Sequence, residues 1–425
     1  MHITFLATLP LRLRLFPVAI AVAIAVSQSA QSQTPWPSWR GPNGNGTAVA
    51  GNYPTSWSEE KNVAWKMALP GRGASTPILL GENLYVTLGK EGINTLLCIS
   101  KDGSTRWEKP FGKERPGRNA KASGSNSSPA TDGKNVYVYF KSGDLACVTQ
   151  SGETVWELNI QQKYGEDSLW WDLGTSPVLT ENAVVIAVMQ TGPSFLVALD
   201  KSTGKELWKA DRWLDVNREA NQAYTTPTIA KLKQGEALIT VGADHVTAHA
   251  VSDGKLLWKL GGFNPGNSGN FRTISSPLAI DGLAICPYAR GQTVTALRTD
   301  VELPADKRIA WAMEFGSDVP TPTIGKRWLY LLGDKGMVYC LKPDTGETIW
   351  SHQLPKSNRQ YSSSPIVANG CVYCVREDGM AFVMADADEP KVVSENRLDG
   401  NIVATPVFAN NRIYIRSYES LYCIQ

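Results

Sequence analysis

The chain has 425 residues, of which 42% are hydrophobic and 19% charged, with 42 basic and 40 acidic side chains and a formal net charge of +2. This balance gives no overall basic character, so we do not expect a nucleic acid as partner. The length suits either two or three ordinary domains or one repeat architecture, and repeats therefore have to be sought first.

The first 30 residues are typical of a secretory signal peptide. Arg12 and Arg14 precede an apolar run of about 12 residues, and small residues follow at Ser29 and Ala30. The run is shorter than the roughly 20 residues that a membrane-spanning helix needs. We expect a cleaved periplasmic or extracellular product without a membrane span. Cleavage would remove two arginines and no acid, leaving 40 side chains of each sign.

A Ser or Thr followed by Pro recurs eight times, every 41 to 52 residues. The prolines of these pairs are Pro77, Pro129, Pro177, Pro227, Pro277, Pro322, Pro365 and Pro406. A period of 40 to 50 residues is typical of β-propeller blades. The sequence therefore predicts an all-β fold, an eight-bladed propeller with four antiparallel strands in each blade.

Each repeat contains turns rich in Gly, Asn and Asp between short alternating strands, as in residues 128–159. Its last strand carries a Trp four residues after a Gly, as at Gly103 and Trp107. A large ring once per outer strand is expected to pack between neighbouring blades. Four cysteines and three alanines share one position in the third strand, which indicates a small buried site.

The eighth repeat ends at Gln425 after only three strands. A spare strand with Trp65 precedes the first repeat, so we expect it to pair with the last blade and to close the ring, since closure removes exposed edges. The predicted organisation is a signal peptide at 1–30, an extended segment at 31–56 and the propeller at 57–425.

These repeats resemble the pyrroloquinoline-quinone (PQQ) dehydrogenase-like propeller family, which includes quinoprotein alcohol dehydrogenases and BamB-like proteins. The resemblance rests on the Ser/Thr-Pro pair, the alternating second strand and the Gly-x-x-x-Trp outer strand. The segment WPSWRGPNGNG, residues 36–46, also resembles the start of the mature region in PQQ-like proteins of planctomycete-type bacteria. The resemblance implies a fold more strongly than an activity, because one fold hosts many functions.

Quinoprotein enzymes of this family bind PQQ with calcium on the propeller axis and use an aspartate base, and many carry an adjacent Cys-Cys disulfide. This sequence has no Cys-Cys pair and few insertions. No catalytic, cofactor-binding or metal residue is assigned, and no cofactor is expected, with PQQ and calcium kept as the alternative. His245 and His249 lie four apart in one expected strand, and no third metal ligand is placed beside them.

The connections between blades differ in length. The first four leave 18 to 21 residues between each outer-strand Trp and the next Pro, whereas two later ones leave 10 and 14. Loops on a rigid scaffold commonly carry binding function. We therefore expect a binding face at Lys113, Arg115, Arg118, Lys121, Trp170, Trp171, Arg212, Trp213, Arg218, Asn270, Phe271 and Arg272, since aromatics and arginine are favoured at interfaces.

The sequence thus favours a non-catalytic, monomeric binding or scaffold protein. By resemblance to BamB, its expected partner is a protein or polypeptide of the cell envelope. Two alternatives stay open. One is a PQQ-dependent dehydrogenase of alcohols or sugars, and the other is a module that binds polysaccharide through exposed Trp and Arg pairs.

Overall fold

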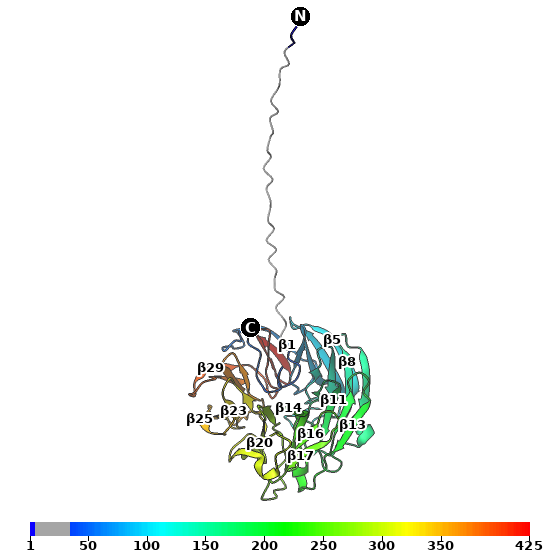
Figure 1. The fold of residues 1–425 in the computed structure, drawn as a ribbon, viewed down its shortest axis with the longest axis vertical. Coiled ribbons are helices and arrows are strands. Elements are labelled where there is room, and N and C mark those ends of the chain that lie inside the picture. The colour runs from blue at the N-terminus through cyan, green and yellow to red at the C-terminus, as the bar shows by residue number, and fades with distance from the viewer. Residues whose placement is uncertain (5–34) are drawn as a thin grey trace. The chain divides into compact units, whose positions relative to one another are not determined.

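The computed structural model describes residues 1–4 and 35–425. The predicted signal peptide lies almost wholly outside these residues. Residues 35–425 form one compact unit, in which eight four-stranded sheets follow one another around a central axis (Figure 1). The predicted eight-bladed, all-β propeller is confirmed.

In seven sheets the strands run in chain order from the axis to the rim, and in the eighth β1 takes the outer place; every neighbouring pair is antiparallel. Blades 1 to 4 comprise β2 (Ile78–Leu80), β3 (Asn83–Lys90), β4 (Ile93–Ser100) and β5 (Thr105–Lys113); β6 (Ala130–Thr131), β7 (Asn135–Tyr139), β8 (Asp144–Thr149) and β9 (Thr154–Asn159); β10 (Val178–Leu179), β11 (Ala183–Val188), β12 (Phe195–Asp200) and β13 (Glu206–Asp211); β14 (Thr228–Leu232), β15 (Gly235–Gly242), β16 (His245–Ala250) and β17 (Leu256–Leu260).

Blades 5 to 8 comprise β18 (Leu278–Ile280), β19 (Leu283–Tyr288), β20 (Thr293–Arg298) and β21 (Ile309–Met313); β22 (Thr323–Ile324), β23 (Leu329–Leu332), β24 (Met337–Leu341) and β25 (Thr348–Gln353); β26 (Ile366–Ala368), β27 (Cys371–Val375), β28 (Met380–Ala385) and β29 (Val392–Arg397); β30 (Val407–Ala409), β31 (Arg412–Arg416), β32 (Ser420–Ile424) and β1 (Val63–Ala68). Four short helical segments lie in loops: α1 (Ile160–Tyr164), η1 (Arg218–Asn221), η2 (Ala289–Gly291) and η3 (Ala305–Lys307).

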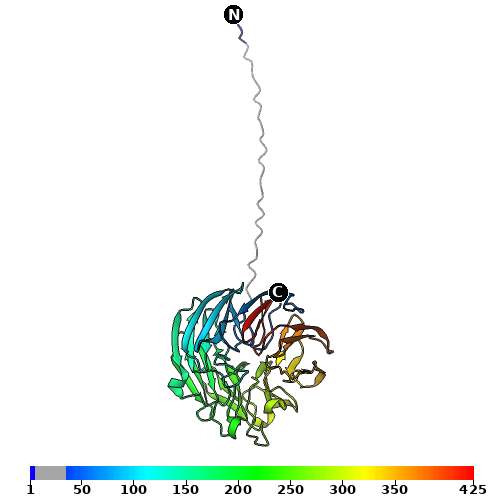
Figure 2. The same cartoon turned by 180° about the vertical axis from the view of Figure 1, so that it is seen from behind.

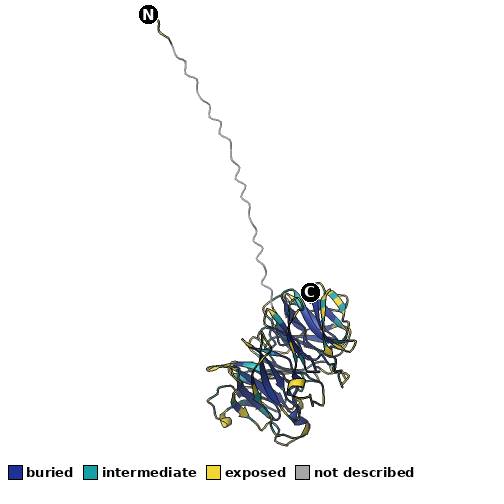
Figure 3. Ribbon diagram, turned by 90° about the vertical axis from the view of Figure 1, so that its right-hand side faces the viewer, coloured by how far each residue is buried: buried dark blue, intermediate teal, exposed yellow. Residues whose placement is uncertain are grey.

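The ring closes as predicted. β1 pairs antiparallel with β32, with Trp65 opposite Cys423, and the reverse view shows this N-terminal strand beside the red C-terminal strands (Figure 2). Every blade thereby reaches four strands. The buried residues lie within and between the sheets, and exposed residues gather in the loops at their ends (Figure 3).

Near the axis the eight Ser/Thr residues that precede the prolines form a closed circle, which we call the hydroxyl ring. The backbone N–H of each residue donates to the side-chain oxygen of its counterpart in the next blade, over 2.9 to 3.3 Å. Thr405 donates to Thr76 and completes the circle.

Six further hydroxyls stand one residue before a ring hydroxyl and lie outside the ring. The residue before each ring hydroxyl is buried inside its blade, because side chains alternate along an extended strand. Thr225, for example, donates to the carbonyl of Val241 within its own sheet. The six hydroxyls are those of Ser75, Ser127, Thr175, Thr225, Ser275 and Ser363, and none of them lines the space at the axis.

At the rim the Trp residues connect neighbouring blades, as predicted. The indole N–H of each of the seven donates to a backbone carbonyl of the next blade over 2.8 to 3.3 Å. The Gly of the Gly-x-x-x-Trp motif leaves room for the Trp of the preceding blade. A Cβ on Gly103, for example, would lie 2.8 Å from the ring of Trp65. Each Trp pairs with one of the predicted small residues on the third strand of its blade, as Trp107 pairs with Cys98.

Residues 36–57 lie across one end of the ring, which we call the lower face. Trp36 is fully buried and pairs with Leu79 of blade 1. The Arg40 guanidinium is buried and donates to the carbonyls of Pro322 and Pro365 in blades 6 and 7, and burial lowers its pKa to about 9. The segment therefore closes the lower end of the axial channel.

Replacing Gly103 by Ala should destabilise the protein more than replacing Gly133. Both glycines have positive φ, 84° and 89°, so each Ala should cost about 1 to 2 kcal/mol of backbone strain. Only at Gly103 would the new methyl also meet the Trp65 ring, whereas Gly133 has open space. Equal losses of unfolding free energy in urea titrations would contradict the packing of Trp65 on Gly103.

Candidate functional site

The face opposite Trp39, which we call the upper face, holds a cavity of about 920 Å³. The loops that connect each outer strand to the next inner strand surround it. Below it, a narrower space of about 140 Å³ passes through the hydroxyl ring down to Trp39. The cavity thus forms the upper mouth of a channel that the N-terminal segment closes below.

Aromatic side chains stand on two sides of this cavity. Trp171 is 42% exposed, and its indole donates to Glu219 over 2.6 Å, which fixes the ring at the rim. Its backbone N–H donates to the hydroxyl of Tyr224, whose pKa burial raises. Across the cavity Phe315 and Tyr339 stack with centroids 4.0 Å apart. These rings offer flat apolar surface to a ligand.

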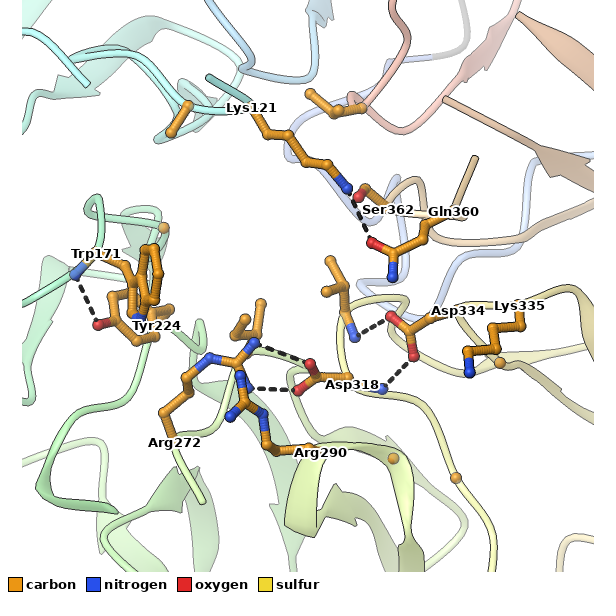
Figure 4. Close-up of a pocket in the computed structure, with 18 of the residues that line it drawn as sticks. Lys121, Trp171, Tyr224, Arg272, Arg290, Asp318, Asp334, Lys335, Gln360 and Ser362 are labelled. Carbon is orange, nitrogen blue, oxygen red and sulfur yellow. Dashed lines mark hydrogen bonds and ion pairs between the residues drawn. The ribbon is translucent and has the colours of Figure 1, made fainter. Parts of the chain in front are cut away.

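Charged groups line the cavity beside Trp171 and Tyr224 (Figure 4). Arg272 donates to both carboxylate oxygens of Asp318 over 3.0 and 2.9 Å. Asp334 accepts from the backbone N–H groups of Asp318 and Val319, and burial raises its pKa. These two carboxylates are therefore already engaged by donors of the protein itself.

Three further cations line the cavity. Lys121 extends across it to Glu377 over 3.0 Å and to Gln360 over 2.9 Å. The side chains of Arg290 and Lys335 have no partner within residues 1–4 and 35–425. Arg290 also has a left-handed backbone with φ of 54°, which is uncommon for a residue other than Gly. Strained backbone at a cavity rim is a feature of ligand sites.

Three of the twelve predicted binding-face residues line the cavity: Lys121, Trp171 and Arg272. The structure places five others on exposed loop surface outside the cavity lining, and Phe271 packs half-buried against the core of blades 4 and 5. The five are Lys113, Trp170, Trp213, Arg218 and Asn270.

The remaining three predicted residues hold the loops together. Arg115 donates to Gln161 over 3.3 Å, and Arg118 donates to the carbonyl of Leu169 over 2.9 Å. Arg212 is buried and donates to Thr247, so its placement on an exposed binding face was wrong. Its long stem and fork-shaped donor group satisfy several backbone carbonyls inside blade 4.

Sequence reasoning missed the cavity residues of blades 5 and 6, above all Asp318, Asp334 and Arg290. These residues follow or lie within short connections, whereas the binding face was predicted from the long connections between blades. The useful signal would have been position relative to the Ser/Thr-Pro pair, because Asp318 stands four residues before Pro322 and therefore close to the axis.

The buried pair Lys141 and Asp172 supports the cavity wall from behind. The two side chains form a salt bridge, and Asp172 also accepts from the backbone N–H groups of Arg118 and Asn119. A buried charge persists only when it is paired and hydrogen-bonded. The pair therefore fixes loop 112–128 against loop 161–174.

The histidine pair considered as a metal site does not gain a third ligand. The Nδ1 atom of His245 lies 2.6 Å from the carbonyl of Ala243, and His249 is buried. Across the described part of the chain, no three His, Cys, Asp or Glu side chains are grouped as metal ligands. All seven cysteines are unpaired.

His249 should make the protein less stable in mild acid. Burial and the nearby Arg212 lower its pKa from 6.5 to about 4. As the pH falls, the unfolded chain binds the proton at a higher pH than the folded protein does. The free energy of unfolding is therefore at its full value above pH 6.5 and decreases as the pH falls towards 4, by up to about 3 kcal/mol. Unfolding titrations should show a smaller loss over this range in His249→Gln, and equal losses would contradict the assignment.

The protein-family comparison agrees with the repeat pattern. The family model described as "Outer membrane protein assembly factor BamB" matches residues 43–195, 172–301 and 292–392. The chain belongs to this family. No curated protein sequence matches it.

Solved structures with the same fold come from both branches of this propeller group. BamB from Moraxella catarrhalis is 15% identical, with a TM-score of 0.62 over 85% of this chain and 99% of that one. A europium-containing methanol dehydrogenase is 10% identical, with a TM-score of 0.67 over 90% and 89%. A quinohemoprotein alcohol dehydrogenase from Comamonas testosteroni is 12% identical, with a TM-score of 0.63 over 92% and 80%. At these identities the likeness concerns the fold alone.

Among the described residues, no helix has the length and apolar character needed to cross a membrane.

Proposed function

We propose that this BamB-family chain is a non-catalytic binding protein whose upper cavity receives a polypeptide of the cell envelope. The observation that carries this proposal is the cavity of about 920 Å³, with aromatic walls and two cations that have no partner within the described residues. Such a site offers stacking surface, charge and a closed floor without any protein group having to move.

Several features favour binding over chemistry. The residues that line the cavity include no His and no Cys. Its carboxylates Asp318 and Asp334 are held by Arg272 and by backbone N–H groups. A general base needs access to the proton that it removes. Aromatic rings beside arginine are instead the groups that contribute most at protein interfaces.

Family membership supplies the proposed partner and compartment. The family is named for an outer-membrane protein assembly factor, which supports an unfolded or partly folded envelope polypeptide as ligand. The predicted signal peptide at 1–30 supports export, with residues 31–56 and 57–425 as the mature chain. Trp170 and Trp213 are exposed but do not line the cavity, so they lie outside the proposed binding site.

Removing one aromatic or one cation from the cavity should weaken this binding. We expect Trp171→Ala and Arg290→Asn each to reduce affinity at least about tenfold, since central aromatic and arginine contacts carry most interface energy. Asn tolerates the left-handed backbone at position 290. The measurement is fluorescence anisotropy of a labelled outer-membrane β-barrel polypeptide diluted from urea.

Trp170→Ala is the matched control for the cavity variants. Trp170 is 52% exposed but does not line the cavity, so its removal should change affinity less than that of Trp171. Melting temperatures of all three variants would show that each is folded. Unchanged affinity in both cavity variants would refute the upper cavity as the binding site.

A PQQ-dependent dehydrogenase is the second candidate, favoured by the similarity to two dehydrogenase structures and by a polar cavity on the axis. The aromatic rings and cations fit a planar, anionic quinone. The donor set does not fit its calcium ion, which takes six to eight oxygen ligands. Asp318, Asp334 and the third lining carboxylate, Asp172, are all engaged by donors of the protein, and the described residues hold no group of three such ligands.

A titration with PQQ, with and without calcium, distinguishes the two candidates. We expect no calcium-dependent change in cofactor absorbance or in melting temperature, because the carboxylates that a calcium ion requires are already engaged. Reduction of a dye acceptor with alcohols or aldose sugars is the activity readout. Tight calcium-dependent binding with turnover would replace the binding proposal by the dehydrogenase.

A further inference from the structure

The lower end of the ring presents one equivalent backbone position in every blade. It lies two residues after each proline of the Ser/Thr-Pro pairs, on the inner strand of the blade. In blade 3 the next residue, Thr180, donates to Ala183 of the second strand. Since bonding alternates along an antiparallel strand, the N–H and C=O of Leu179 point away from its own sheet and towards the axis. We call these eight residues the inner-edge positions.

The N-terminal segment 36–53 covers five of the eight inner-edge positions. Leu79 exchanges two backbone hydrogen bonds with Trp36, over 3.1 and 3.0 Å, and Val367 does the same with Gly46 and Ala48, over 2.9 and 2.8 Å. The other three contacts are single hydrogen bonds: Thr131 donates to Pro37, Ile324 accepts from Thr47, and Phe408 accepts from Tyr53. The chain therefore binds an extended segment along its own inner strands.

Blades 3, 4 and 5 lack this cover. The backbone groups of their inner-edge residues Leu179, Ile229 and Ala279 have no hydrogen-bond partner beyond their own sheets within residues 1–4 and 35–425. Leu179 and Ile229 line a groove of about 320 Å³ between these blades and residues 37–44 of the N-terminal segment. The groove thus lies beside the covered positions, on the same face of the ring.

We propose that this lower groove binds a short extended segment of another polypeptide by strand addition to the inner strands of blades 3 to 5. The bound backbone would form hydrogen bonds with the backbone groups of Leu179 and Ile229. These bonds would be equivalent to those that Leu79 forms with Trp36 and that Val367 forms with Gly46. Strand addition obtains affinity from main-chain hydrogen bonds and selectivity from alternate side-chain pockets. Neither the groove nor its residues belong to the upper cavity.

The lining of the groove indicates the side chains of the bound segment. Its walls are largely apolar, with Pro177, Val178, Leu179, Pro227 and Ile229 facing residues 37–44. Its only charged lining residue is Arg40, whose guanidinium is turned to the carbonyls of blades 6 and 7. The groove therefore suits an uncharged segment with β-branched or other small apolar side chains.

The first test uses the full chain and two synthetic peptides. One is a labelled Thr-Val-Thr-Val-Thr peptide, and the other has the same sequence with alternate amides N-methylated. We expect only the first to bind, and to slow hydrogen exchange at the amides of Leu179, Ile229 and Ala279. Equal binding of both peptides, absence of binding, or protection confined to the upper face would overturn the proposal.

The second test removes the free donors themselves. Leu179→Pro with Ile229→Pro deletes two N–H groups that take no part in the sheet, a substitution that edge strands tolerate. Affinity for the unmethylated peptide should fall about tenfold, since each neutral hydrogen bond contributes modestly. The matched control Leu179→Val with Ile229→Val keeps both donors and should bind normally.

These outcomes are independent of the upper cavity. Trp171→Ala should leave peptide binding in the lower groove unchanged, and the proline variants should leave binding of the unfolded β-barrel polypeptide unchanged. If the proline variants fail to fold, the exchange measurement on the unmodified protein still decides. Equal affinity of the folded proline variant and the valine control would overturn strand addition.

Discussion

The hydroxyl ring is the contact on which the rest of the structure depends. Eight backbone N–H groups donate to eight hydroxyl oxygens of neighbouring blades, and the last returns to the first. Each bond is worth only about 1 kcal/mol, but a closed circle fixes the spacing of all inner strands at once. The Trp side chains repeat this connection at the rim, each against the next blade. Strand β1 is needed for both, because it brings Trp65 to the junction where the two ends of the ring meet.

Both proposed binding sites lie where the eightfold repetition breaks down. On the lower face the N-terminal segment covers the inner strands of five blades and leaves three free, which creates a groove with unused backbone groups. On the upper face four consecutive long connections are followed by shorter ones, and the cavity between them holds two cations without a partner in the described residues. A ring with equal blades would have neither feature, since every inner-edge position would have the same partner. The two sites lie at opposite ends of one axial channel and use different chemistry, side chains above and backbone below.

Prediction from the sequence succeeded for features that repeat and failed for features that do not. Blade number, strand order and the closing strand follow from Ser/Thr-Pro and Gly-x-x-x-Trp spacing, and all are present in the structure. Loop composition placed Trp171, Lys121 and Arg272 on a predicted binding face, and these three line the cavity. It misplaced Arg212, because an arginine in a loop can as readily satisfy buried carbonyls as face solvent. It missed Asp318 and Asp334, because closeness to the axis, rather than loop length, places a residue in the cavity.

The sequence by itself determined the propeller, since local spacing decides which strands pair within a blade and the period of the repeats decides how many blades form. Only the tertiary structure decided which blade each Trp serves, where residues 36–57 lie and which polar groups remain free. These outcomes depend on contacts such as Arg40 with Pro322 and Pro365, between segments hundreds of residues apart. Such contacts exist only after the ring has closed, and no local pattern along the chain encodes them.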